Sequence, residues 1–476
     1  MMESRCYEPS SYASRIASPA MIEASGDDRS RLRFAIALAA IAVVALSIRI
    51  AFVVVVDPSV PKIGDASAYH LLAEHLARGD GYIRPFDELL LHRTLPTAEY
   101  PPLFPAMLAI PARVGLHSVE SQRLFLVLVG TGTVVLIGLL GRRVGGRGVG
   151  IVAAALAACS PMLFQSEGIL MAEALYAPLV VIALLLTYRA YDKPTIGRFA
   201  ALGAVIGLAT LTRAEGALHG LLLVVGLSLR GARLPTRERL VHGATAIAVA
   251  LAVLAPWTIR NAVRFHAVVP VSNNAATLVD GANCDSTYSG PELGLWRETF
   301  SEFGDRARQL PQAQACFEGF NIADPHFDEV KVASMHRRDG VNYALDHLES
   351  FPKVAAVRVL RTWALYAPRQ QVNFEALEGR PREWQMRGTV MHWFVLPLAI
   401  AGVMLCRRRR AVIWPLVTTT LAVSVLSALT YGQQRFRVGA EPALLVLAAV
   451  TLDALWQRTR RHRDQTESRP DSVVRR

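Results

Sequence analysis

Long apolar segments constrain the fold of this chain more than any other feature of its sequence. They are about 20 residues long, the length at which a helix crosses a bilayer, and they recur along most of the 476 residues. Backbone polar groups inside a bilayer must bond within their own segment, which favours helices. The sequence therefore predicts an all-α polytopic membrane protein with about 10 transmembrane helices. We expect them at roughly residues 33–56, 121–141, 148–164, 169–190, 197–212, 216–230, 241–257, 388–406, 411–431 and 437–457.

Basic residues indicate how these helices are oriented. They follow the second, fourth, sixth, eighth and tenth predicted spans, and the loops on the other side carry few of them. Since cytoplasmic loops are enriched in Lys and Arg, we expect both termini in the cytoplasm and the segments 57–120 and 258–387 outside. The same rule accounts for the formal net charge of +12, so this charge gives no reason to expect nucleic-acid binding. Arginine far outnumbers lysine, which is typical of a GC-rich bacterial genome and favours a bacterial plasma (inner) membrane.

The spans and loops divide the chain into a few parts. Cytoplasmic tails are expected at the two ends. Between them we expect an N-terminal transmembrane module that includes the first outer loop, then a small extracytoplasmic domain, then a final set of transmembrane helices. In chain order the expected bounds are 1–32, 33–257 (with the loop 57–120), 258–387, 388–457 and 458–476.

The first outer loop contains a predicted helix that starts at Asp65. Apolar residues at positions 69, 72, 73 and 76 have the spacing of one helical face, and Gly79 is a typical helix stop. Such a helix would lie on the membrane surface with its apolar side down. Asp65 would then be held at the boundary between water and lipid.

Two of the five cysteines, Cys284 and Cys316, lie in the long outer segment. If this segment faces an oxidising compartment, the two side chains are able to form a disulfide. The alternative is a pair of free thiols.

Ionisable residues at membrane depth are costly and usually functional. In this chain they are concentrated at the outer ends of the predicted spans, where one outward-facing pocket could collect them. Such a pocket would hold carboxylates for acid–base chemistry and guanidinium groups for a phosphate. The residues concerned are Asp65, Glu99, Glu167, Glu173, Arg213, Glu215, Arg260, Arg435, Arg437 and Glu441.

Short motifs around these residues occur in a fixed order. They are Gly64-Asp65, Tyr69, Glu99-Tyr100-Pro101-Pro102, Met171-Ala172-Glu173, Leu211-Thr212-Arg213-Ala214-Glu215, Pro256-Trp257-Thr258-Ile259-Arg260 and Arg435-Phe436-Arg437-Val438-Gly439-Ala440-Glu441. The ordered set resembles the bacterial polyprenyl-phosphate-sugar-dependent glycosyltransferases of the GT-C membrane fold, which include protein O-mannosyltransferases and lipid A aminoarabinose transferases. The resemblance runs over residues 33–457. It implies a GT-C fold and a sugar donor carried on a polyprenyl phosphate.

The resemblance implies that Asp65 contacts the acceptor nucleophile, and the chemistry agrees with this role. Transfer of a sugar from a phosphate needs a general base for the proton of the acceptor hydroxyl. The alternative is that Asp65 only caps the helix that follows it. Glu173 matches a second active-site carboxylate of the family, with Glu167 as a rival. The alternative for Glu173 is an acidic residue favourably placed at a helix N-terminus.

Arginines are the candidates for binding the donor phosphate, because a guanidinium stays charged and bonds phosphate oxygens in pairs. The alternative is that they snorkel to the membrane interface. They are Arg213, Arg260, Arg435 and Arg437, and the other pocket candidates are Tyr69, Glu99, Tyr100, Pro101, Glu167 and Glu441. A divalent metal near Glu99 is conceivable, but the spacing of the nearby residues supports no ligand set. We therefore predict no metal and commit to no cofactor.

The sequence thus predicts an integral-membrane glycosyltransferase that moves a sugar, with inversion, from a polyprenyl-phosphate donor to an extracytoplasmic acceptor. The acceptor is a glycan, a lipid or a protein. The sequence has no nucleotide-binding phosphate loop, and an outward site has no access to cytoplasmic nucleotide sugars. The alternatives are a lipid or sugar transporter or flippase, or a non-catalytic membrane scaffold. A transporter needs a path through the bilayer centre, yet the middle of the predicted spans carries almost no ionisable residues.

Overall fold

Helices make up most of the computed structural model, which describes residues 19–58, 60–62, 64–230, 234–296, 316 and 327–467. Over these residues, β-pairing is limited to an isolated bridge between Ile83 and Pro96. The predicted all-α class is therefore confirmed.

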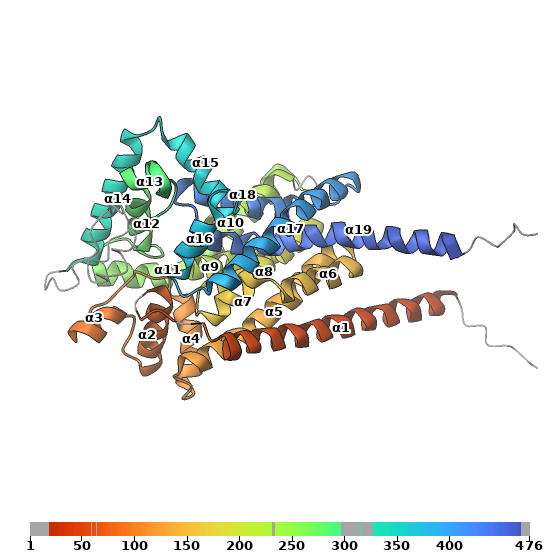
Figure 1. Ribbon diagram of the computed structural model, residues 1–476, viewed down its shortest axis with the longest axis horizontal. Helices are drawn as coiled ribbons and strands as arrows, with labels where there is room; N and C mark the ends of the chain where they lie inside the picture. Colours follow the sequence, from red (N-terminus) through yellow and green to blue (C-terminus); the bar gives the residue numbers. More distant parts are fainter. Residues whose placement is uncertain are drawn as a thin grey trace, which may run out of the picture.

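A bundle of long helices, at the positions of the predicted spans, sets the long axis of the molecule (Figure 1). Five of these helices are long and apolar enough to cross a membrane, or six if the bent pair α6 and α7 is one span. The shorter apolar helices include α9, α10 and α18. The expected count of ten spans is thus not confirmed. The bundle helices are α1 (Pro19–Ala51, extended by a π-helical turn Phe52–Val56), α5 (Val119–Gly145), α6 (Arg147–Ala158), α7 (Pro161–Gly168), α8 (Glu173–Asp192), α9 (Ile196–Thr212), α10 (Gly216–Arg230), α11 (Thr236–Phe265), α17 (Arg382–Arg408), α18 (Trp414–Leu429) and α19 (Glu441–Glu467).

Some bounds differ from those expected. The predicted span 148–164 is bent by 47° between α6 and α7, because Pro161 at the start of α7 has no N–H to continue the preceding helix. Helix α1 begins well before residue 33, and α19 continues past residue 457, so parts of both predicted tails are helical. Residues 1–18 and 468–476 of those tails lie outside the described residues.

Glycines allow the bundle helices to approach closely. A Cβ atom at Gly203 of α9 would lie 2.1 Å from the carbonyl oxygen of Ala246 in α11. One at Gly402 of α17 would lie 2.0 Å from the carbonyl oxygen of Leu447 in α19. Small residues at such contacts are typical of helices that pack within a membrane, where apolar side chains gain little by leaving lipid.

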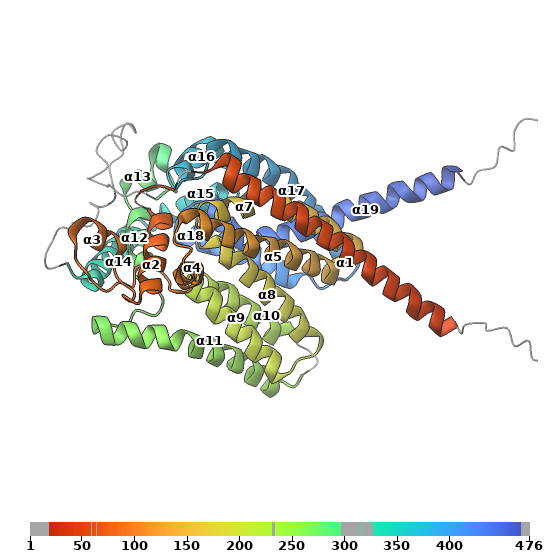
Figure 2. The ribbon, with the colours of Figure 1, turned by 90° about the horizontal axis from the view of Figure 1, so that it is seen from below.

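A second group of helices covers one end of the bundle. Figures 1 and 2 show α2, α3, α12 and α14 at the end opposite to the start of α1 and the end of α19. The helix expected in the first outer loop is present as α2, and Gly79 ends it with a positive φ of 90°. The members of this group are α2 (Asp65–Arg78), α3 (Pro85–Leu91), α4 (Leu103–Arg113), α12 (Asn274–Ala282), α13 (Asp285–Tyr288), α14 (Glu329–Asp346), α15 (Phe351–Thr362) and α16 (Pro368–Ala376).

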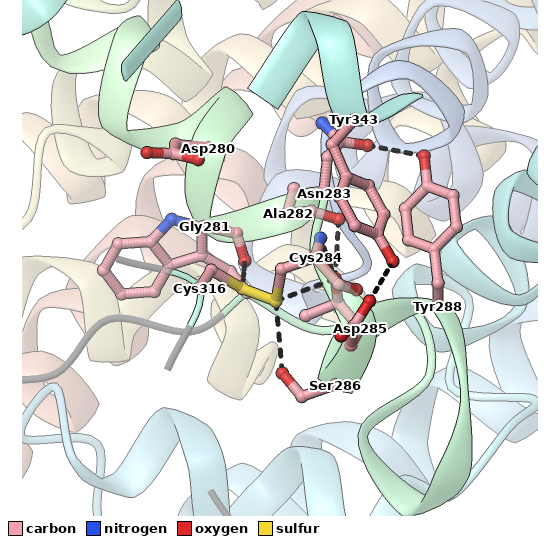
Figure 3. Close-up of a disulfide and its surroundings, with 12 residues drawn as sticks. Asp280, Gly281, Ala282, Asn283, Cys284, Asp285, Ser286, Tyr288, Cys316 and Tyr343 are labelled. Carbon is pink, nitrogen blue, oxygen red and sulfur yellow. Dashed lines mark hydrogen bonds between the residues drawn. A yellow bond between two sulfur atoms is a disulfide. The ribbon is translucent and has the colours of Figure 1, made fainter. Parts of the chain in front are cut away.

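We call this second group of helices the outer group, and a disulfide between Cys284 and Cys316 lies within it (Figure 3). Of the two alternatives that the sequence allows, a disulfide or a pair of free thiols, the structure has the disulfide. Next to it, the hydroxyl of Tyr343 in α14 donates a 2.6 Å hydrogen bond to Oδ1 of Asp285 in α13. The covalent bond and the hydrogen bond both connect segments that are distant in sequence, so this part of the outer group is built as one unit.

Candidate active site

Asp65 is the point where the outer helices meet the bundle. Its Oδ1 accepts a 3.2 Å hydrogen bond from the hydroxyl of Tyr100, and its Oδ2 accepts one of 3.1 Å from Nη1 of Arg435. The helix starts at Asp65 itself, and no side chain caps its N-terminus, so capping does not occupy the carboxylate. The side chain is 28% exposed. Each carboxylate oxygen has a second lone pair that these hydrogen bonds do not use, so Asp65 is still able to accept a proton.

Arg435 bridges several carboxylates that come from different parts of the chain. It lies in a 3-10 turn, Gln434–Gly439, directly before α19. Besides Asp65, its Nη1 contacts Oε2 of Glu378 at 3.3 Å, and its Nε lies 3.9 Å from Oε1 of Glu173. Burial lowers the pKa of Arg435, but Glu378, Tyr431 and Asp65 outweigh that effect and hold it well above the usual value. The guanidinium is therefore firmly charged.

Glu173 stands between two arginines. It is the first residue of α8 and is buried. Its Oε1 also forms an ion pair with Arg213, 2.8 Å from Nη1. Arg213 follows the end of α9 and forms a further close ion pair with Glu215. The structure thus brings together five of the charged residues singled out in the sequence: Asp65, Glu173, Arg213, Glu215 and Arg435.

Two charged residues of this cluster, Glu378 and Arg380, were not expected from the sequence. Glu378 contacts Arg435 as described above, and burial raises its pKa. Arg380 is buried with its three guanidinium nitrogens lacking hydrogen-bond partners in the described part of the chain, and its Nε lies 3.9 Å from Oε2 of Glu375. A buried charge without hydrogen bonds is unfavourable, which makes Arg380 suited to an anionic ligand. Both residues lie in the loop between α16 and α17. Charged residues are common in such loops, so their presence in the sequence does not indicate a site.

Arg437 and Glu441 form a separate buried pair. Nε of Arg437 lies 3.5 Å from Oε2 of Glu441, and its Nη1 donates to the carbonyl oxygen of Thr362 at 3.4 Å. Oε1 of Glu441 accepts a hydrogen bond from Ser160. Within the described part of the chain, the hydrogen bonds and ion pairs of these two residues do not include Asp65, Glu173 or Arg435. The pair therefore fastens the base of α19 to the start of α7 and to α15.

Arg260 and Glu167 also make contacts outside the cluster. Arg260 of α11 donates to the carbonyl oxygens of Thr97 at 2.7 Å and Tyr82 at 2.9 Å, so it holds the first outer loop. Glu167 of α7 forms a buried ion pair with Arg49 of α1 at 2.9 Å. Both arrangements connect helices, and the structure gives neither residue a contact with Asp65.

The aromatic residues of the first outer loop shape the wall beside Asp65. The rings of Tyr69 and Tyr100 pack edge to face, with centroids 5.1 Å apart. Burial raises the pKa of Tyr100 well above its usual value, and the nearby Asp65 raises it further. Tyr100 therefore stays protonated, and its hydroxyl donates a hydrogen bond to Asp65. The backbone carbonyl oxygen of Pro101 accepts a 3.3 Å hydrogen bond from Tyr82, which fixes the turn after Tyr100.

Glu99 gives the first outer loop a pH-dependent contribution to stability. Burial raises its pKa from 4.5 to about 7, although Arg84 opposes this shift. A carboxyl group that binds its proton more tightly in the folded state stabilises the fold at low pH and loses this contribution as the pH rises from 4.5 to about 7. We expect Glu99→Gln to raise the apparent unfolding temperature by about 2–4 °C at pH 8, but to leave it unchanged at pH 4. Thermal unfolding of the purified protein at both pH values measures this.

Glu120→Gln, at an exposed position of α5, is the control for the Glu99 variant and should change neither unfolding temperature. An equal effect of Glu99→Gln at both pH values would show that the ionisation of Glu99 is not responsible.

The donor groups of the cluster do not fit a bound divalent metal. Among the described residues, no group of three or more His, Cys, Asp or Glu side chains is arranged to hold an ion. Asp65, Glu173 and Glu378 each face a guanidinium instead.

Comparison with known proteins agrees with the motif resemblance. Residues 99–259 match the family model described as Dolichyl-phosphate-mannose-protein mannosyltransferase. This segment includes Glu173 and Arg213. No curated protein sequence matches the chain.

Solved structures of an archaeal enzyme share the fold. The archaeal oligosaccharyltransferase AglB from Archaeoglobus fulgidus, in complex with an inhibitory peptide and a dolichol-phosphate, is 14% identical with a TM-score of 0.50, over 92% of this chain and 52% of that one. The apo form of the oligosaccharyltransferase from the same organism is 14% identical with a TM-score of 0.50, over 90% of this chain and 52% of that one. ArnT from Cupriavidus metallidurans, bound to undecaprenyl phosphate, is 16% identical with a TM-score of 0.42, over 88% of this chain and 78% of that one. The chain spans about half the length of the archaeal enzymes, and identities this low establish the fold alone.

Proposed function

We propose that this chain, which matches the family model described as Dolichyl-phosphate-mannose-protein mannosyltransferase over residues 99–259, is a membrane glycosyltransferase that transfers a sugar from a polyprenyl phosphate to an acceptor outside the membrane. The observation that carries the proposal is the partly exposed carboxylate of Asp65, held by Arg435 and Tyr100 beside the pair of Glu173 and Arg213. This arrangement supplies a base next to groups that stabilise negative charge.

The proposed reaction is a single displacement at the anomeric carbon of the sugar. Asp65 accepts the proton of the acceptor hydroxyl as its oxygen bonds to the anomeric carbon. The bond from that carbon to the phosphate oxygen breaks, and polyprenyl phosphate leaves with the electron pair. Attack opposite to the leaving group inverts the configuration. The hydrogen bond from Tyr100 to Oδ1 orients the carboxylate, so that a free lone pair faces the acceptor.

Arginines near Asp65 are proposed to bind the leaving phosphate. Guanidinium groups in a buried site stabilise charge that grows on a leaving oxygen. Arg435 and Arg213 are suitable, although both are paired with carboxylates in the structure, so binding of a phosphate would exchange some of those contacts. Within the residues that the structure describes, Arg380 has no hydrogen bonds to lose, and its contact with the carboxylate of Glu375 is long, at 3.9 Å. We therefore add Arg380 to the residues proposed to hold the donor.

The active site is proposed to face the outside of a bacterial plasma membrane, with both termini in the cytoplasm. In support, the start of α1 and the end of α19 lie at the opposite end of the molecule from α2 and α14 (Figure 1). The disulfide between Cys284 and Cys316 lies on the side of α14, and disulfides persist in oxidising compartments. Reaction of these two thiols with a membrane-impermeant maleimide, only after reduction of intact cells, checks this orientation.

Mass spectrometry of the cell envelope from a strain that lacks the gene tests the proposed function. We expect one sugar to be missing from a glycan, a lipid or a protein, and the wild-type gene to restore it. The missing mass identifies both the sugar and the acceptor. An envelope in which every sugar is still attached would contradict the proposal.

A further inference from the structure

Glu329 joins the outer helices to the first outer loop. It is the first residue of α14, and its carboxylate is almost fully buried. Its Oε1 accepts hydrogen bonds of 2.9 Å from the backbone N–H of Ala98 and from Nδ2 of Asn273. Its Oε2 accepts a 2.8 Å hydrogen bond from the hydroxyl of Thr97. One carboxylate thus binds three donors from two other segments.

The position of Glu329 is fixed by the packing of α14 on α12. Nδ1 of His336 lies 2.6 Å from Oδ2 of Asp280, which connects the two helices through buried side chains. At Gly340 of α14 a Cβ atom would lie 2.7 Å from the backbone of Asp280, so the helices touch closely there. The N-terminus of α14 also receives a side-chain cap from Asp328. These contacts hold the backbone of Glu329 in a fixed position.

The loop that Glu329 holds leads directly to the proposed base. Thr97 and Ala98 come just before Tyr100, and the carbonyl oxygen of Ala98 accepts a further 2.9 Å hydrogen bond from the N–H of Asn273. The hydroxyl of Tyr100 then reaches Asp65. Any shift of residues 97 and 98 must move Tyr100, because only one residue lies between them and Tyr100.

We propose that Glu329 is a positioning residue that sets the hydroxyl of Tyr100 on Asp65, and that the outer helices thereby control the geometry of the base. This inference rests on the proposed transferase function. Without its carboxylate, the hydroxyl of Thr97, the N–H of Ala98 and the amide of Asn273 would lose their shared acceptor. The loop would then relax, and the proton of Tyr100 would no longer be aimed at Asp65.

Transfer rates of the full-length purified protein test this role. We expect Glu329→Ala to lower kcat by about 10- to 100-fold, since small misplacements of catalytic groups cost this much. Glu329→Gln keeps an oxygen for Ala98 and Asn273 and an amide that can donate to Thr97, so it should retain most of the rate. Asp339→Ala is the matched control, because Asp339 lies on the same helix and pairs with its exposed neighbour Arg338; its rate should equal that of the wild type.

A double-mutant cycle separates positioning from general damage to the fold. If Glu329 acts through Tyr100, then Glu329→Ala should cause little further loss in a protein that already carries Tyr100→Phe. Losses that multiply in the double variant would overturn the proposal, as would a wild-type rate for Glu329→Ala.

Hydrogen exchange of the peptide around residues 96–104 tests the contact without relying on transfer. Glu329→Ala should exchange faster in this peptide, while Asp339→Ala should not. If the wild-type protein transfers no sugar but the exchange result holds, the proposed function fails and Glu329 remains the residue that fixes this loop. Unchanged exchange in Glu329→Ala would overturn the inference even in an active enzyme.

Discussion

Asp65→Asn should reduce sugar transfer by about 10²–10⁴-fold, the usual contribution of a general base. The amide has the same shape as the carboxylate, and its oxygen can still accept a hydrogen bond from Arg435, so the protein should fold. The amide cannot take the proton of an acceptor hydroxyl at neutral pH, and this is the loss that the experiment measures. The variant is to be assayed with a polyprenyl-phosphate sugar and purified acceptor, and by restoration of the envelope sugar in the deletion strain.

Asp80→Asn is the control for this experiment. Asp80 lies in the same outer loop and pairs with Arg78 at the surface, so the substitution makes the same chemical change away from the cluster. It should leave transfer at the wild-type rate. A transporter or a scaffold would tolerate both substitutions, because neither activity needs a base at Asp65. Near-normal transfer by Asp65→Asn would show that another group is the base.

Local signals in the sequence were sufficient to predict helix α2, but not every feature of the long helices. The bounds of α2 follow from the apolar spacing after Asp65 and from Gly79, because both act within a few residues. The bend between α6 and α7 was missed, since a proline within an apolar segment indicates a break only weakly when the hydropathy continues across it. The count of spans depends on lengths and tilts that hydropathy does not determine.

The composition of the cluster was only partly predictable. Asp65 and Arg435 are 370 residues apart, and they were expected together because both end predicted spans on one side of the membrane. Glu378 and Arg380 were missed, because a charged residue in a polar loop carries no signal until packing buries it. Arg437 was expected in the cluster beside Arg435. In a 3-10 turn of about three residues per turn, however, residues two apart point in different directions, so Arg437 faces Glu441 instead.

Because Arg435 contacts Asp65 and Arg437 does not, we expect the second large effect on sugar transfer from a substitution of Arg435. Arg435→Gln should lower kcat/KM by about 10²–10³-fold, the loss seen when a group that stabilises developing charge is removed. The guanidinium contacts both Asp65 and Glu378, so its removal also disturbs the base. Arg435→Lys keeps the charge but cannot bridge two carboxylates and bond a phosphate in pairs, and we expect an intermediate rate. Binding of polyprenyl phosphate to each purified variant separates loss of donor affinity from loss of chemistry.

Arg437→Gln is the matched control, because Arg437 lies two positions away and is also buried. Removal of one partner from its buried pair leaves Glu441 uncompensated and should destabilise the fold by about 3–5 kcal/mol. The molecules that remain folded should transfer sugar at the wild-type rate. Adding Glu441→Gln removes the unpaired charge and should recover much of the stability. A loss of transfer in the stable double variant equal to that of Arg435→Gln would place Arg437 in the reaction and would refute the division of roles between the two arginines.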